Sequence, residues 1–268
     1  MNQDTIKEKL LKIEDAPLEF SLVFSGKKSK KVNGLYKPAS REIIIHNRNF
    51  QSGDTGDNLL LYTAIHEYAH HLHACSRGGT LSPRAHNSEF WAIFHDLLDK
   101  AQEKKIYSDI FSVSPELLKL TDLIRDKYLK NNGELVKEMG KHLIKAHNLC
   151  FKLGVRFEDY VDRMLRIPRA AANMAIKSFE YDLLPEVGAD NMRFLTGIRD
   201  SDERKAAEAA LVKGKSPDSV KVQVRKKDKE EDPLELLEKE KSRLERTIAS
   251  LNKRLEEVKR ELKKAASD

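Results

Sequence analysis

The side chains best suited to chemistry are four histidines within residues 66–73, out of nine in the 268-residue chain. The first two, His66 and His70, frame the motif His-Glu-x-x-His. On an α-helix, residues four apart lie about 40° apart around the axis, so both imidazoles can face one point, as two zinc ligands require. Glu67 lies beside them, where its carboxylate can take a proton from a metal-bound water without becoming a ligand. The spacing therefore predicts a catalytic site with one zinc ion per chain.

A catalytic zinc ion needs a third protein ligand and keeps its fourth position for water. Downstream of the motif, suitable side chains occur at His86, Glu89 and His95. We favour His86, because it lies where the chain returns after a double-glycine turn and its side chain can point back at the motif. Glu89 is the alternative, although its carboxylate would have to turn from the first turn of its own helix. His95 lies about two turns deeper in that helix.

The other histidines near the motif have different expected roles. His73 follows His66 by seven residues and lies near the same helix face, so it could hydrogen-bond a substrate, support the ligands by hydrogen bonding, or lie in solvent without a role in the site. Direct ligation by His73 in place of His86 is a further possibility. His71 projects in a different direction and is expected to be structural, and His46 is expected to end a strand.

The segments before the motif predict a small sheet. Residues 18–24 and 41–46 are apolar and rich in residues that favour strands. Glycine, Asn-Gly and proline turn signals lie between them, and residues 32–36 could form a short strand of their own. We therefore expect a β-hairpin or short sheet in front of the motif.

Two helices are expected to carry the candidate ligands. The first begins at a cap formed by Asp57 or Asn58 and ends at residues 78–79, two consecutive glycines. The second is capped by Asn87 or Ser88 and has an apolar face. Strands and helices together predict a compact α+β unit.

This arrangement resembles the compact zinc metallopeptidases of the SprT-like group and the related YgjP-type hydrolases, over about residues 15–100. The resemblance implies a zincin-like catalytic domain. By the same resemblance, His66, His70 and His86 would bind zinc, and Glu67 would be the catalytic acid and base.

The resemblance also implies roles for neighbouring segments. Phe90 and Trp91, which begin four residues after the third histidine, would pack behind that ligand. In such peptidases an edge strand before the active helix pairs with the extended backbone of the substrate, and residues 41–46 are the candidate here. An ordinary paired strand is the alternative.

The rest of the chain predicts helices and a tail. We expect a zinc metallopeptidase domain at 1–112, an all-α domain at 113–212, a charged linker at 213–232 and a coiled coil at 233–268. The helices of the all-α domain are expected at about 115–130, 133–151, 157–164, 168–182 and 200–212. In the tail, apolar residues recur at heptad spacing, with Lys241 as an exception at the seam.

Residues 140–182 contain a candidate helix-turn-helix, formed by two short helical patterns around the break "LRIP". The segment loosely resembles helical DNA-binding modules of phage and plasmid proteins. Four side chains would contact DNA phosphates or base edges: Arg166, Arg169, Asn173 and Lys177. The alternative is a helical bundle with solvated basic residues.

Composition limits the class of protein. Charged residues make up 34% of the chain, its formal net charge is +6, and no apolar run is long enough to span a bilayer. We therefore expect a cytoplasmic zinc metallopeptidase without membrane contact, acting on protein substrates. Double-stranded DNA and a homodimer or other partner of the coiled coil are further expected partners. A zinc hydrolase of a non-peptide substrate, and a DNA-binding or assembly protein with structural zinc and an inactive hydrolase fold, are the alternatives.

Overall fold

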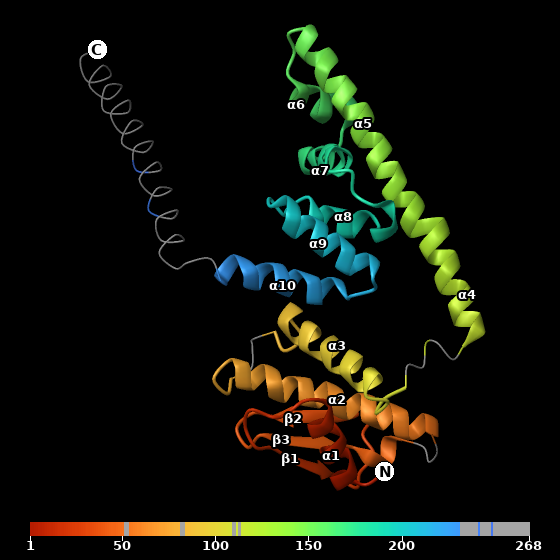
Figure 1. Ribbon diagram of the computed structural model, residues 1–268, viewed down its shortest axis with the longest axis vertical. Coiled ribbons are helices and arrows are strands. Elements are labelled where there is room, and N and C mark those ends of the chain that lie inside the picture. Colours follow the sequence, from red (N-terminus) through yellow and green to blue (C-terminus); the bar gives the residue numbers. More distant parts are fainter. Residues whose placement is uncertain are drawn as a thin grey trace. The chain divides into compact units, whose positions relative to one another are not determined.

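The computed structural model describes residues 1–50, 54–80, 84–108, 111, 114–230, 241 and 248, with the backbone alone at 54–55 and 226–230. The chain divides into two units, Met1–Val222 and Gln223–Asp268. The described part is mainly helical and contains one three-stranded sheet (Figure 1). No helix in it combines the length and apolar character that a membrane span requires.

The sheet consists of β1 (Ser21–Phe24), β2 (Gly34–Lys37) and β3 (Glu42–Ile45), in the order β1-β3-β2. Strand β3 pairs in parallel with β1 and antiparallel with β2. All three strands lie within or next to the predicted segments. The expectation that residues 41–46 form an edge strand is wrong, because the main chain of β3 is hydrogen-bonded on both sides. The two edges belong to β1 and β2.

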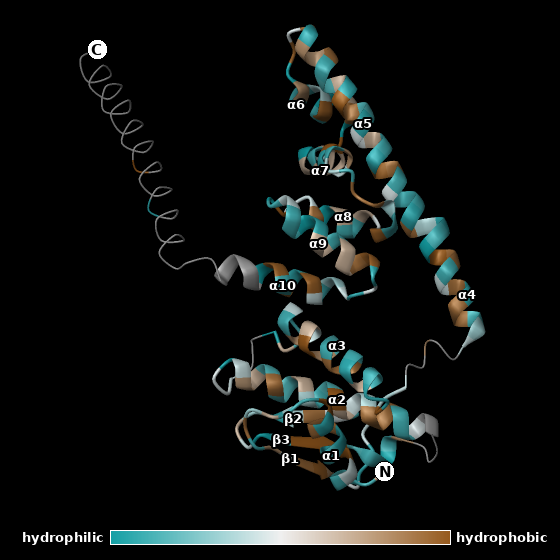
Figure 2. Cartoon of the chain, in the orientation of Figure 1, coloured by the Kyte–Doolittle hydropathy of each residue, from teal (hydrophilic) through white to brown (hydrophobic). Residues whose placement is uncertain are grey.

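The core of this part lies between the sheet and three helices (Figure 1). Ile43 and Ile45 of β3 are fully buried, and the three strands are largely apolar (Figure 2). Helix α1 (Gln3–Ile13), which we did not predict, buries Ile6, Leu10 and Ile13, spaced four and three residues apart, against the same core. Its start is capped by Asn2, whose side chain accepts a hydrogen bond from the Thr5 amide at 2.8 Å.

Helices α2 (Asp54–Ser76) and α3 (Ser88–Glu103) pack against each other and carry the candidate site. Helix α2 starts at Asp54, before the predicted caps, and ends before the two glycines, which both have positive φ angles as a helix terminus requires. Asn87 caps α3 as predicted, because its side chain accepts a hydrogen bond from the Phe90 amide at 2.9 Å.

The helices expected at 115–130 and 133–151 form one continuous helical stretch. It consists of α4 (Pro115–Ile124), a π-helical segment (Arg125–Lys130) and α5 (Asn131–Lys152). The glycine at 133 does not interrupt it. A Cβ atom there would lie 2.5 Å from the Pro185 carbonyl oxygen. The two chain segments can therefore come this close only because residue 133 has no side chain.

The remaining helices fold back along α5. After α6 (Phe157–Asp159) and a π-helical segment (Tyr160–Leu165) come α7 (Arg169–Glu180), α8 (Ala189–Leu195) and α9 (Ser201–Val212). Helix α8 was not predicted; the others match the expected segments within a few residues.

The C-terminal segments differ in part from expectation. Most of the stretch expected as a linker at 213–232 is helix α10 (Pro217–Glu230). Proline is favourable in a first helical turn, and Val220 is buried, so this charged segment has an apolar anchor that its composition did not suggest. The expected coiled coil at 233–268 lies outside the described residues except for Lys241 and Ile248, which are helical and exposed.

Candidate metal centre

Three histidine side chains converge between α2 and α3. His66 and His70 extend from successive turns of α2, and His86 lies just before α3. The Nε2 atoms of His66 and His86 are 3.1 Å apart, and those of His70 and His86 are also 3.1 Å apart. Among the described residues, these three side chains are close enough together to hold a metal ion.

The geometry of the three histidines fits a tetrahedral cation. Nitrogen ligands at about 2.0–2.1 Å from a tetrahedral zinc ion are separated by about 3.3 Å, which is close to both observed distances. A neutral imidazole has one N–H donor and one nitrogen with a lone pair. Where the lone pairs of three such rings face one point, a cation at that point can bind all three.

Burial favours the neutral form of two of the histidines. Burial, with a smaller effect of His86, lowers the pKa of His66 to about 4. Burial, with smaller effects of the neighbouring histidines, lowers the pKa of His70 to about 3. Both imidazoles are therefore neutral at pH 7 and offer a lone pair, which is the protonation state that a metal requires. His86 is exposed and leaves one side of the group open to solvent.

Aromatic side chains of α3 form a wall behind the ligands. The ring of Phe90 stacks on His70 with centroids 4.2 Å apart and lies 4.8 Å from His86. The ring centroids of Trp91 and His86 are 5.7 Å apart, and those of Phe94 and His66 are 5.1 Å apart. Phe90 and Trp91 thus pack against His86, where the family resemblance would place them.

Glu67 belongs to α2, and its side chain lies against Gly34 at the start of β2. Its residue surface is only 6% exposed, and burial raises the pKa of its carboxyl group to about 7. A Cβ atom on Gly34 of β2 would come within 2.9 Å of the Glu67 Cγ atom and 3.1 Å of its Oε1 atom. The absence of a side chain at Gly34 therefore makes the room in which the carboxylate lies, which no spacing in the sequence indicated.

The other candidate ligands are engaged elsewhere. Glu89 Oε2 lies 3.5 Å from His73 Nε2 and 3.3 Å from Arg77 Nη1, and neither Glu89 nor His73 belongs to the three-histidine group. His73 is nearly inaccessible and 6.4 Å from the Phe90 ring centroid, so it links the C-terminal part of α2 to the first turn of α3. His95 stacks on Trp91 at 5.8 Å between ring centroids.

Two further histidines hold the sheet in place. His71 is completely buried, and its ring nitrogens lie 3.0 Å from the Tyr36 hydroxyl and 3.0 Å from the Leu18 carbonyl oxygen. These bonds connect α2 to β2 and to the segment before β1, which agrees with a structural role. His46 follows β3 and is hydrogen-bonded through Nδ1 to the Ser25 hydroxyl at 2.8 Å.

The predicted DNA-contacting residues lie on or near α7, and only some of them are available. Arg169 forms a bidentate ion pair with Asp162, with Nε 2.9 Å from Oδ2. Arg166 adopts a left-handed backbone conformation at the end of the preceding helical segment and is exposed, as is Asn173. The two helical segments and the turn occur as predicted, but Arg169 is already paired with Asp162 and Lys177 is hydrogen-bonded to the Thr196 carbonyl oxygen.

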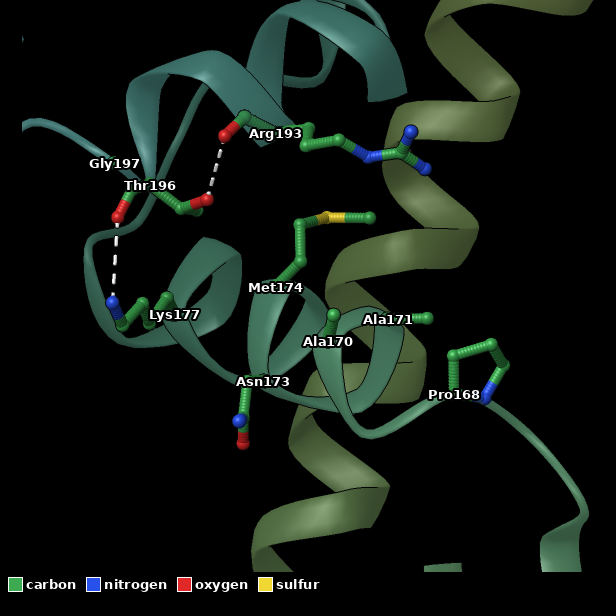
Figure 3. Close-up of a pocket in the computed structure, with 9 residues that line it drawn as sticks. All are labelled: Pro168, Ala170, Ala171, Asn173, Met174, Lys177, Arg193, Thr196 and Gly197. Atoms are coloured by element: carbon green, nitrogen blue, oxygen red, sulfur yellow. Dashed lines mark hydrogen bonds between the residues drawn. The ribbon is translucent and has the colours of Figure 1, made fainter. Parts of the chain in front are cut away.

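A pocket of about 500 Å³ lies beside α7 (Figure 3). Lys177 donates a hydrogen bond to the Thr196 carbonyl oxygen at 3.5 Å on one side, and Arg193 extends on the other side. Met174 and small residues of α7 line the space between them. The pocket is separate from the histidine group, and its lining is mainly apolar.

Comparisons with protein-family models, with curated proteins and with solved structures find no match to this chain. Any functional inference therefore depends on the geometry of the side chains.

Proposed function

We propose that this protein is a zinc-dependent metallopeptidase that hydrolyses protein substrates. The observation that carries the proposal is the convergence of His66, His70 and His86 next to the buried carboxyl group of Glu67. Three histidines leave one coordination position of a tetrahedral ion for water or substrate, which is typical of catalytic rather than structural zinc sites. The exposure of His86 gives a substrate access to that position.

The protein groups have separable tasks in this reaction. A bound zinc ion would act as a Lewis acid and lower the pKa of a water molecule to about 7. Glu67 would accept a proton from the attacking water and donate it to the leaving amine when the C–N bond breaks. In the metal-free chain, burial raises the pKa of this carboxyl group to about 7, so Glu67 can carry a proton near neutral pH. The aromatic wall of α3 would exclude water from one side and keep the imidazoles in place.

The unpaired edge of β2 is the natural place for an extended substrate. Within the described part of the chain, strand β2 pairs with β3 alone, and its first residue, Gly34, lies against Glu67. A peptide that adds to this edge would satisfy main-chain hydrogen bonds and need little side-chain specificity. This assigns to β2 the role that the sequence suggested for residues 41–46.

Metal content and turnover test the proposal together. We expect one zinc ion per wild-type chain by elemental mass spectrometry, and its loss in His70→Ala and His86→Ala. Glu67→Gln should keep the zinc ion and lose cleavage of fluorescently labelled casein. The control Glu89→Gln should keep both, because Glu89 lies outside the ligand group. Cleavage by Glu67→Gln at the wild-type rate would refute the mechanism, and zinc without any proteolysis would favour a non-peptide substrate or a structural zinc site.

A further inference from the structure

The loop that joins β1 to β2 carries a dense positive charge. Residues 25–33, "SGKKSKKVN", contain four lysines and no acidic residue. All four lysines are exposed, and none forms an ion pair with a described residue. Arg48, in the turn after β3, is also exposed and unpaired among the described residues. We call residues 25–33 together with Arg48 the basic loop.

The basic loop is held by hydrogen bonds and is not a flexible tail. The Asn49 side chain accepts from the Ser29 amide and donates to the Ser29 carbonyl oxygen, both at 2.8 Å. It also donates to the Asn33 side-chain oxygen at 2.8 Å. The Gly26 amide donates to the Asn47 side-chain oxygen at 2.9 Å. Like charges are thus held in one short segment without an ion pair to a described residue, an arrangement that costs free energy unless an anionic partner is bound.

The position of the loop relates it to the metal centre. Residue 33, the last of the segment 25–33, is followed directly by Gly34. A Cβ atom on Gly34 would lie 2.9 Å from the Glu67 Cγ atom. The loop leaves the end of β1 and returns to the start of β2, the edge strand beside the motif helix (Figure 1). Only the end of the loop, at residue 33, is thus placed beside Glu67.

We infer that the basic loop binds the phosphate backbone of nucleic acids without preference for base sequence. Lysine acts on phosphate as a point charge, and contacts to phosphate position a protein on DNA without reading its sequence. The loop is poor in apolar side chains, with Val32 the apolar residue it exposes, whereas a membrane-surface element needs an apolar face that enters the lipid. Binding here needs neither the metal ion nor Glu67, so it stands or falls independently of peptidase activity.

The test measures binding of the full chain to a fluorescent 20-base-pair duplex and a 20-nucleotide single strand at several salt concentrations. The loop variant replaces four lysines by glutamine: Lys27, Lys28, Lys30 and Lys31. The control variant removes the same charge from exposed, scattered lysines: Lys12, Lys119, Lys152 and Lys205. Loss of four phosphate contacts lowers the slope of log K against log salt by about 3.6 for duplex and about 2.8 for single-stranded DNA. Circular dichroism and melting temperature check that both variants fold.

The expected result is a flattened salt dependence in the loop variant and a nearly wild-type slope in the control. Equal losses in both variants would show that net charge alone matters and would overturn the inference. Failure of the wild type to bind either nucleic acid in 50 mM salt would also overturn it. Loop-dependent binding to phosphatidylserine vesicles without binding to nucleic acid would assign the loop to a membrane surface instead.

Discussion

The metal-free Glu67→Gln variant is expected to gain stability relative to the metal-free wild type as the pH rises from 5 to 9. In the folded chain, burial raises the pKa of the Glu67 carboxyl group from its ordinary value of 4.5 to about 7. Between these values the folded state binds a proton that the unfolded chain has lost. The contribution of this group to stability is therefore fully present below pH 4.5 and is lost as the pH rises through 7. Glutamine is neutral at every pH and has no such dependence.

The magnitude follows from the size of the shift. A pKa difference of about 2.5 units corresponds to about 3.4 kcal/mol in full, at 1.36 kcal/mol per unit. About 0.8 kcal/mol of this is already lost at pH 5, because the unfolded carboxyl group is then largely ionised. The free-energy difference between Glu67→Gln and wild type should therefore change by about 2.5 kcal/mol between pH 5 and pH 9, in favour of the variant. His66 and His70, whose pKa values are lowered by burial, are present in both proteins, so their effects cancel in this difference.

The assay is urea unfolding with a chelator present, followed by tryptophan fluorescence. Trp91 is the single tryptophan of the chain and lies against His86, so its fluorescence reports unfolding of the candidate site. Glu8→Gln is the control, because Glu8 is exposed and unpaired among the described residues. If the difference for Glu67→Gln were the same at pH 5 and pH 9, the pKa of the Glu67 carboxyl group would not be raised in the folded chain, and the reasoning would be refuted.

Three further substitutions test individual contacts. Gly34→Ala should slow casein cleavage at least tenfold without removing zinc, because the new methyl group displaces Glu67; unchanged cleavage would mean that the carboxylate position is not critical. Gly140→Ala should destabilise the helical part by about 1–3 kcal/mol in thermal melts, because a Cβ atom would lie 2.0 Å from the Ala175 carbonyl oxygen. A wild-type melting temperature would contradict that close packing. Asn49→Ala should speed trypsin cleavage within the basic loop, and cleavage at the wild-type rate would show that the loop is held by other contacts.

Local spacing in the sequence was enough to predict the half of the site that lies on one helix. The four-residue interval places His66 and His70 on one face of any α-helix, with Glu67 one position further round, whatever surrounds that helix. The Asn87 cap and the strand segments were predictable for the same reason, because caps and strand patterns involve residues close in sequence. These features depend on interactions within a short stretch of chain.

The tertiary structure decided the choice among side chains that are distant in sequence. His86 and Glu89 were both candidate ligands, and the choice depends on how the chain returns to α3 and on the pairing of Glu89 with His73 and Arg77. The central position of β3 likewise depends on which strands pair, which its own residues do not specify. The role of Gly34 became visible only where β2 meets α2. Contacts of this kind join segments through packing, and packing is a property of the folded chain rather than of any short stretch of it.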